Sequence, residues 1–175
     1  AVDNGAACAG VAGLAERLAA EGGLRRTRAT LALFSGEEAN MQGSRAYVRG
    51  RSWPLPAAAV NLELLGQDGG YVLWERDGTG FRWLATAAAV NARLAAAVQE
   101  VAGQPPQPAG HLNSDGASFL AQGIPTAVLG TRDQVLGLTG LHRPSDNLSR
   151  IDLSRLPEAV EILARFVRRV DETSL

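Results

Sequence analysis

A continuous apolar run that ends at two adjacent carboxylates is the feature that most constrains the fold of this chain. Residues 29–34 are short, apolar and flanked by polar residues, a pattern typical of a strand buried on both faces of an α/β sheet. Glu37 and Glu38 follow the run, and open α/β sheets place ligands at the carboxyl ends of their strands. We therefore expect a strand at 29–34 and two glutamates at the ligand-binding edge of a sheet.

The two glutamates allow two interpretations. Adjacent ionised carboxylates repel each other and raise one pKa, and a divalent cation between them is the simplest remedy. Alternatively, Glu37 and Glu38 open the next helix, where acidic residues interact favourably with the positive end of the helix dipole. For this pair alone the helix-start interpretation is the stronger one.

Other ligand-type residues in similar contexts favour the metal interpretation. Asp3 lies in a loop before a helix predicted over 6–20, whose apolar stripe follows helical spacing. Glu63 interrupts an apolar strand pattern at 57–66, where a lone acid is costly unless it is paired or metal-bound. Ser114-Asp115 precedes a short predicted helix and a strand at 124–130, and His142 lies in the Pro- and Asn-containing loop 141–147. The sequence thus offers several metal-binding side chains at the ends of predicted elements.

Taken in order, these segments resemble the co-catalytic zinc aminopeptidase family, which includes bacterial leucyl aminopeptidases, aminopeptidase Y and glutamate carboxypeptidases. The family's signatures are an Asp-Asn loop before a helix, Gly-Glu-Glu after a strand, Asn-Leu-Asp at a strand end, Ser-Asp before Gly-Ile-Pro, and His-x-Pro-x-Asp. The counterparts here begin at Asp3, Gly36, Asn61, Ser114 and His142. Each motif is weak alone, but five in sequence span nearly the whole chain.

The resemblance implies roles for particular residues. Asp3 matches the carboxylate that bridges two zinc ions, and Glu38 and His142 match ligands of the second zinc. Glu37 matches the general base, which takes a proton as water attacks a peptide carbonyl and returns it to the leaving amine. Glu63 stands where the family has an aspartate that binds the first zinc.

Two departures concern that first zinc. The chain begins at Ala1-Val2-Asp3, after the position of the histidine that the family supplies to this ion. In addition, Glu63 is one methylene longer than the usual aspartate. We therefore expect one zinc ion, held by Asp3, Glu38 and His142, rather than the family's two. His111 is expected to be a solvent-facing or supporting loop residue.

Two alternatives remain open at this stage. A glutaminyl-cyclase-like acyltransferase would use a single zinc ion and a carboxylate pair within the same fold. A non-catalytic homologue would keep the fold as a binding module with a degenerate metal site. Glu37, Glu38 and His142 argue for catalysis, whereas the absent histidine and Glu63 argue for the non-catalytic homologue.

Composition excludes several classes of partner. The 175 residues are 46% hydrophobic and carry a net charge of −1, so neither nucleic acid nor an anionic membrane is an expected partner, and no apolar run reaches the roughly 20 residues of a membrane span. The expected partner is a peptide substrate. All 17 basic residues are arginines, as in proteins of high-GC bacterial genomes. The single cysteine, Cys8, excludes an intrachain disulfide and is predicted to be a buried packing residue.

The predicted fold is a three-layer αβα sandwich around a mixed, mostly parallel sheet, of the zinc exopeptidase type. We expect a further strand at 71–76, helices at 84–101 and 153–170, and a proline-stiffened surface loop at 104–108. Residues 1–175 are expected to form a single catalytic-type domain that lacks the family's N-terminal strands. Because such a sheet would expose an edge, self-association or pairing with the missing segment is also expected.

Overall fold

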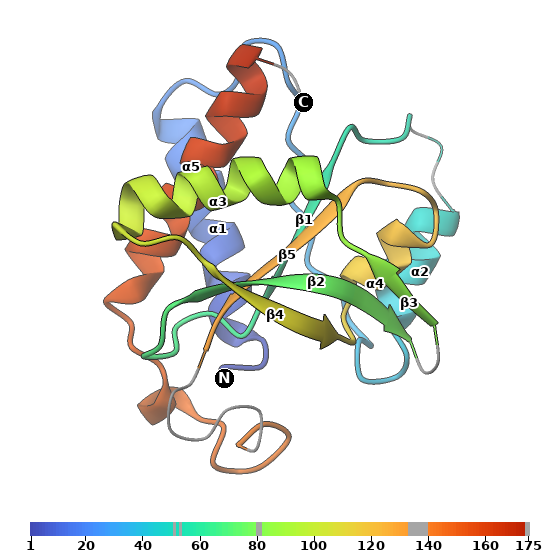
Figure 1. Ribbon diagram of the computed structural model, residues 1–175, viewed down its shortest axis with the longest axis vertical. Coiled ribbons are helices and arrows are strands. Elements are labelled where there is room, and N and C mark those ends of the chain that lie inside the picture. Colours follow the sequence, from blue (N-terminus) through green and yellow to red (C-terminus); the bar gives the residue numbers. More distant parts are fainter. Residues whose placement is uncertain (51, 53, 80–81, 133–139, 174–175) are drawn as a thin grey trace.

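The computed structural model describes residues 1–50, 52, 54–79, 82–132 and 140–173 (Figure 1). Its helices are α1 (Gly5–Ala20), α2 (Gln42–Arg49), α3 (Ala88–Ala102), α4 (Gly116–Leu120) and α5 (Arg155–Thr173), with a 3-10 helix, η1, at Leu148–Arg150. Its strands are β1 (Ala59–Glu63), β2 (Tyr71–Thr79), β3 (Arg82–Ala85), β4 (Gln107–Leu112) and β5 (Thr126–Thr131).

All five strands belong to one mixed sheet. The order is β1-β5-β2-β3, and β4 also pairs with β2. The β1–β5 and β2–β4 pairs are parallel, whereas β2 runs antiparallel to both β3 and β5. The mixed sheet expected from the sequence is confirmed, with parallel and antiparallel pairings equally represented among the described strands.

Helices cover the sheet in two layers, as the αβα prediction requires. On one face, α5 packs against both α1 and α3 (Figure 1). The main core lies between these helices and the sheet, and its fully or almost fully buried side chains include Leu14, Leu94, Leu129 and Ile162. On the other side, α4 contacts β1, β2, β3 and β5, and α2 packs on α4.

Helical periodicity explains α5 and its place in the core. Ala159, Ile162, Leu163 and Phe166 are buried at spacings of three and four residues, so one stripe of the helix faces the sheet. Near its C-terminal end, the Asp171 carboxylate accepts hydrogen bonds from the backbone N–H groups of residues 25, 26 and 27. These bonds lower the pKa of Asp171 and fix the loop that follows α1. Within the described ranges, no helix has the length and apolar character needed to cross a membrane.

The strand predicted at 29–34 is wrong. This segment has no regular secondary structure, and the side chains of Leu31 and Leu33 are 38% and 61% exposed. A strand needs a hydrogen-bonding neighbour, and none of the described strands, β1 included, pairs with this segment. The apolar run therefore indicated β character without a ladder to join.

Other predictions need smaller corrections. The helix predicted from 84 begins at Ala88, because Leu84 belongs to β3, which pairs with β2. The surface loop predicted at 104–108 gives way at Gln107 to β4, which pairs with β2; such an edge strand tolerates Pro108. Cys8 was predicted to be buried but is exposed, because the packed stripe of α1 runs through Ala6, Ala7, Gly10, Leu14 and Leu18.

Candidate metal centre

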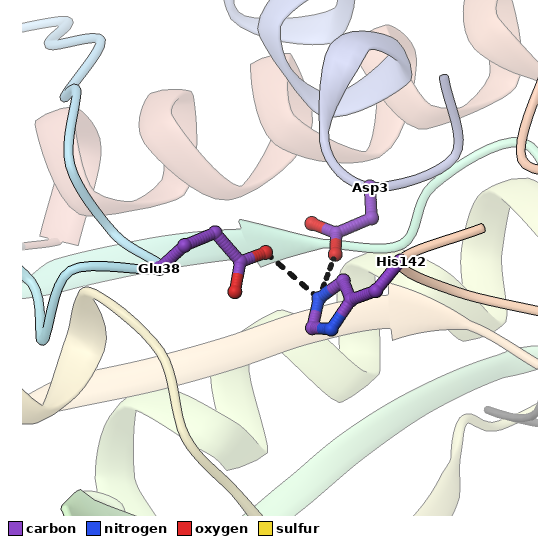
Figure 2. Close-up of side chains that lie close together, drawn as sticks. All are labelled: Asp3, Glu38 and His142. Carbon is purple, nitrogen blue, oxygen red and sulfur yellow. Dashed lines mark hydrogen bonds and ion pairs between the residues drawn. The ribbon is translucent and has the colours of Figure 1, made fainter. Parts of the chain in front are cut away.

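Three ligand-type side chains from separate parts of the chain meet beside the end of β1. Asp3 comes from the segment before α1, Glu38 from the turn before α2, and His142 from the loop before η1 (Figure 2). The Nε2 atom of His142 lies 2.9 Å from Asp3 Oδ2 and 2.7 Å from Glu38 Oε1. One ligand atom from each residue lies within 4.8 Å of the other two.

This donor set fits zinc. Zinc accepts imidazole nitrogen and carboxylate oxygen, and in a tetrahedral site with bonds of about 2.0–2.1 Å the ligand atoms lie roughly 3.3 Å apart. The separations from His142 are slightly shorter, because its Nε2 hydrogen-bonds to Asp3 and forms an ion pair with Glu38. The Glu38 carboxylate, and after it that of Asp3, raises the pKa of His142. The site is therefore anionic enough to attract a cation.

A tight turn presents the two glutamates. Gly36 has a φ of 73°, a left-handed conformation that glycine adopts without strain. The turn closes through a 2.7 Å hydrogen bond from Met41 N–H to the Glu37 carbonyl. Gly43 is packed so closely that an added Cβ would lie 2.4 Å from the Ser35 carbonyl oxygen. Because α2 starts only at Gln42, the glutamates are in the turn, and the helix-start interpretation is wrong.

Asp146 holds the histidine loop beside the N-terminal segment. Its carboxylate accepts hydrogen bonds from the backbone N–H groups of Val2, at 2.7 Å, and Asp3, at 3.1 Å. Burial alone would raise the pKa of Asp146, but these bonds outweigh it and hold the pKa below its ordinary value. His142 itself has a φ of 56°, an unusual conformation for a non-glycine residue. The contacts of Asp146 thus join the loop that carries His142 to the segment that carries Asp3.

Glu37 lies next to the three-residue cluster without joining it. Its side chain is half-buried, and its pKa is raised to about 7, first by burial and then by the carboxylates of Glu38, Asp115 and Asp3. A carboxyl group with a pKa near neutrality can accept and release a proton at physiological pH. Its placement is compatible with the general-base role that the sequence predicts.

Glu63, the fourth predicted ligand, lies outside the cluster. It is the last residue of β1 and is 7% exposed. Both carboxylate oxygens accept from asparagine amides, Oε2 from Asn4 at 2.8 Å and Oε1 from Asn61 at 3.0 Å. Burial raises its pKa to about 8, although the hydrogen bond from Asn61 opposes the shift. These amides are partners that the sequence motifs did not indicate.

A buried hydrogen-bond chain continues from Glu63 into the interior. Asn61 Nδ2 also donates to the Ser114 hydroxyl at 2.9 Å, and that hydroxyl donates to the Asp77 carboxylate. Asp77 is fully buried and accepts backbone N–H groups of Gly78 and Ser114 through its other oxygen. This series of hydrogen bonds links β1, β2 and the start of α4 beneath the site. Sequence reasoning missed Asp77, since its only signal was a single acid in an otherwise ordinary strand.

Asp115 stands near this chain with an unsatisfied atom. Its Oδ1 is buried and has no hydrogen-bond partner, and burial raises its pKa. Although Asp115 stands at the N-terminal end of α4, its side chain makes no capping hydrogen bond to that helix. Its carboxylate instead contributes to the raised pKa of Glu37.

The three-residue cluster opens into a cavity of about 600 Å³, within the range of roughly 300–1,000 Å³ typical of small-ligand sites. Glu37 and Glu63 line it together with the three clustered side chains. Trp83 and His111 form part of its wall, with ring centroids 4.2 Å apart. His111 thus faces the same cavity but is not part of the three-residue cluster.

Comparisons with known proteins give a matching family and similar folds. The family model described as "Peptidase family M28" matches residues 1–167. No curated protein sequence gives a significant match.

Several solved structures have a similar fold. An aminopeptidase from Aneurinibacillus sp. strain AM-1 is 23% identical, with a TM-score of 0.72 over 94% of this chain and 38% of its own. The Legionella pneumophila LapA aminopeptidase is 17% identical, with a TM-score of 0.71 over 100% of this chain and 47% of its own. BSAP, a zinc aminopeptidase from Bacillus subtilis, is 19% identical, with a TM-score of 0.69 over 96% of this chain and 41% of its own. The chain therefore spans less than half the length of each of these structures, and at these identities the likeness is one of fold.

Proposed function

The chain belongs to peptidase family M28, and we propose that the protein is a zinc-dependent aminopeptidase that hydrolyses N-terminal peptide bonds. One observation carries the proposal: Asp3, Glu38 and His142, far apart in the sequence, bring one ligand atom each within 4.8 Å of the others. Glu37 lies beside them, in a cavity large enough for part of a peptide. We also propose that residues 1–175 act as one catalytic-type domain.

Asp3, Glu38 and His142 would hold one zinc ion. Two carboxylates and one imidazole leave a fourth tetrahedral position open, as catalytic zinc sites require. The chemistry that zinc supplies when bound is Lewis acidity, which polarises a carbonyl and lowers the pKa of water to roughly 7. One of the proteins with a similar fold is described as a zinc aminopeptidase, which supports the choice of metal.

Glu37 is the proposed general base. It is adjacent in sequence to Glu38 but is not in the ligand cluster, so its carboxylate is free to move a proton. It would take a proton from the attacking water and deliver it to the leaving amine. The reaction then needs no covalent intermediate with the protein.

Glu63 remains the predicted ligand of a second ion. Its two hydrogen bonds from Asn4 and Asn61 already satisfy both oxygens. Each oxygen keeps a lone pair, so a metal bound there would share the carboxylate with Asn4 and Asn61. The single zinc ion that we propose is the one held by Asp3, Glu38 and His142. In the proposed role, Glu63 and its amide partners support the floor of the site.

The test compares hydrolysis of aminoacyl anilides by zinc-loaded wild-type protein and by Glu37→Gln. We expect Glu37→Gln to lower kcat by about 10²–10⁴-fold, the usual contribution of general acid–base catalysis, while zinc content is unchanged. Glu75→Gln, at an exposed position of β2, is the matched control and should keep wild-type kcat. Full activity in Glu37→Gln would refute the role of the base.

The same assay separates the alternatives. An aminopeptidase requires a free amino terminus, so N-acetylated anilides should not be cleaved. Cyclisation of peptides with N-terminal glutamine, without anilide hydrolysis, would instead identify a glutaminyl-cyclase-like acyltransferase. Zinc binding without either reaction would identify a binding module.

A further inference from the structure

A second cavity lies between α2, α4 and β3, which Figure 1 shows gathered on one side of the molecule. Its volume is about 210 Å³. No residue of its wall lines the metal-site cavity. Along β3, Arg82 and Leu84 face this cavity whereas Trp83 lines the other, as the alternation of side chains along a strand requires.

The wall of this second cavity is strongly basic. Arg45 and Arg49 reach it from α2, and Arg82 reaches it from β3. The residues that complete the wall are all uncharged, namely Val48, Gly78, Leu84, Ala117, Ser118, Ala121 and Gln122. Three arginines therefore line one small space, and no residue of its wall carries a carboxylate.

These arginines lack the ion pairs that other arginines of the chain form. Arg17, Arg165 and Arg169 each pair with a glutamate. In the described ranges, no salt bridge or hydrogen bond joins the guanidinium groups of Arg45, Arg49 or Arg82 to an acid. Arg45 and Arg49 are also four residues apart on α2, a spacing at which like charges repel. The chain, whose net charge is −1, thus concentrates uncompensated positive charge at this point.

The scaffold that holds the arginines is well anchored. The buried hydroxyl groups of Ser44 on α2 and Ser118 on α4 lie 2.8 Å apart and share a hydrogen bond. Phe34, Tyr47 and Phe119 form a cluster of aromatic rings against the same pair of helices, with centroids 5.3–6.4 Å apart. Because α2 is fixed against α4, the two α2 arginines have a defined position relative to β3.

We propose that Arg45, Arg49 and Arg82 form a binding site for a small phosphate-type anion. A guanidinium group presents planar, paired N–H donors that match the oxygens of phosphate. The cavity is smaller than the roughly 300–1,000 Å³ of typical drug-sized ligand sites, which suits an ion of the size of phosphate or diphosphate. Gln122, which also lines the cavity, has an amide that would serve as a further neutral donor.

Anion binding there would stabilise the segment that carries the metal ligands. The α2 helix follows directly after the turn with Glu37 and Glu38, whose backbone closes on residues 41–43. An anion bridging Arg45 and Arg49 to Arg82 would hold α2 to β3 and remove the repulsion between the two α2 arginines. The site is independent of the proposed peptidase chemistry and can be tested without it.

The test is isothermal titration of chelator-treated protein with phosphate, diphosphate and glycerol phosphate, at fixed ionic strength. Treatment with chelator removes metal, so that diphosphate cannot bind through zinc. We expect saturable 1:1 binding that is strongest for diphosphate. Glycerol phosphate tests whether the natural ligand is a phosphate ester or free phosphate. If it binds as tightly as inorganic phosphate, the site accepts a phosphate ester.

Variants assign the binding to the three arginines. Replacement of any one of them by Gln should weaken diphosphate binding about tenfold, the effect of losing one charged hydrogen-bonding group. Arg45→Lys keeps the charge but loses the paired donors, so it should fall between Arg45→Gln and wild type. Arg28→Gln, at an exposed residue outside the cavity, is the matched control and should bind like wild type. Circular dichroism checks that each variant is folded.

Three results would overturn the proposal. One is the absence of saturable binding of any phosphate. Another is diphosphate binding that all three Arg→Gln variants retain in folded form, which would place the anion elsewhere. The third is tighter binding of citrate than of diphosphate, which would assign the site to carboxylates.

Discussion

Asp77 provides a quantitative test of how the buried network under the metal site works. The residue is fully buried, and burial raises its pKa to about 6 despite the hydrogen bonds from Ser114, Gly78 and Ala117 that favour the carboxylate. Its carboxyl group therefore binds a proton more tightly in the folded chain than in the unfolded chain, where its pKa is about 3.9. The stability contributed by this group is fully present below pH 4 and is lost as the pH rises through 6.

The magnitude follows from the shift. A difference of about two pKa units corresponds to roughly 3 kcal/mol across the full range. Wild type and variant can both be unfolded by urea between about pH 4.5 and pH 7.5. Over this range the linkage relation predicts that the contribution of Asp77 to the free energy of unfolding falls by about 2 kcal/mol. Because the side chain of Asp77→Asn cannot titrate, the variant lacks this loss. As the pH rises from 4.5 to 7.5, its free energy of unfolding should therefore increase by about 2 kcal/mol relative to that of wild type.

The assay is urea unfolding of wild type and Asp77→Asn at both pH values, with the free energy of unfolding extrapolated to water. The difference between variant and wild type cancels the other groups that titrate, such as Glu63 and Glu37. Glu75→Gln, at an exposed position of β2, controls for loss of a charge as such. A change below about 0.5 kcal/mol would mean that Asp77 titrates as in the unfolded chain, and would refute the argument from burial.

Three further predictions concern the site and its scaffold. Asp146→Ala removes the acceptor for Val2 and Asp3 N–H, so zinc affinity should fall about 10–100-fold in calorimetric titration, as for other residues that orient ligands; unchanged affinity would contradict the positioning role. Asp171→Asn weakens the clamp on residues 25–27 and should lower the thermal unfolding midpoint at neutral pH. Because the pKa of Asp171 is lowered, the stability that its carboxylate contributes is present above about pH 4 and is lost as the pH falls through the folded-state pKa. A difference in midpoint between variant and wild type that persists unchanged into that acid range would contradict this role of Asp171. Leu94→Ala empties a fully buried position of α3 and should cost about 2–5 kcal/mol in urea unfolding, whereas a cost under 1 kcal/mol would mean that the core is not packed as described.

The long helices could be predicted from the sequence because their packing patterns are local. The apolar stripes predicted helices at 6–20 and 153–170, close to α1 at Gly5–Ala20 and α5 at Arg155–Thr173. Strands depend on partners distant in the chain. The run 29–34 looked like a strand but has no ladder to join, whereas Gln107 and Pro108, which looked like a loop, are held in β4 by pairing with β2.

In the site too, features carried by local motifs could be predicted from the sequence, whereas features that depend on distant contacts could not. Its charged residues stand in short motifs, so the grouping of Asp3, Glu38 and His142 was accessible from sequence, and the structure brings these three together. Their use as zinc ligands stays a prediction. The contact of Asn4 with Glu63 spans 59 positions of the chain and that of Ser114 with Asp77 spans 37, and no local motif encodes them. The arginines of the second cavity likewise come from two elements more than 30 positions apart.

Zinc stoichiometry tests the central claim most directly. Elemental analysis after zinc loading and removal of free metal should give one zinc ion per chain for wild type and for the control Glu75→Gln. The double variant Glu38→Ala, His142→Ala should retain none, because one remaining carboxylate cannot hold the ion. Zinc retained by the double variant, or no zinc in the wild type, would contradict a metal site built from Asp3, Glu38 and His142.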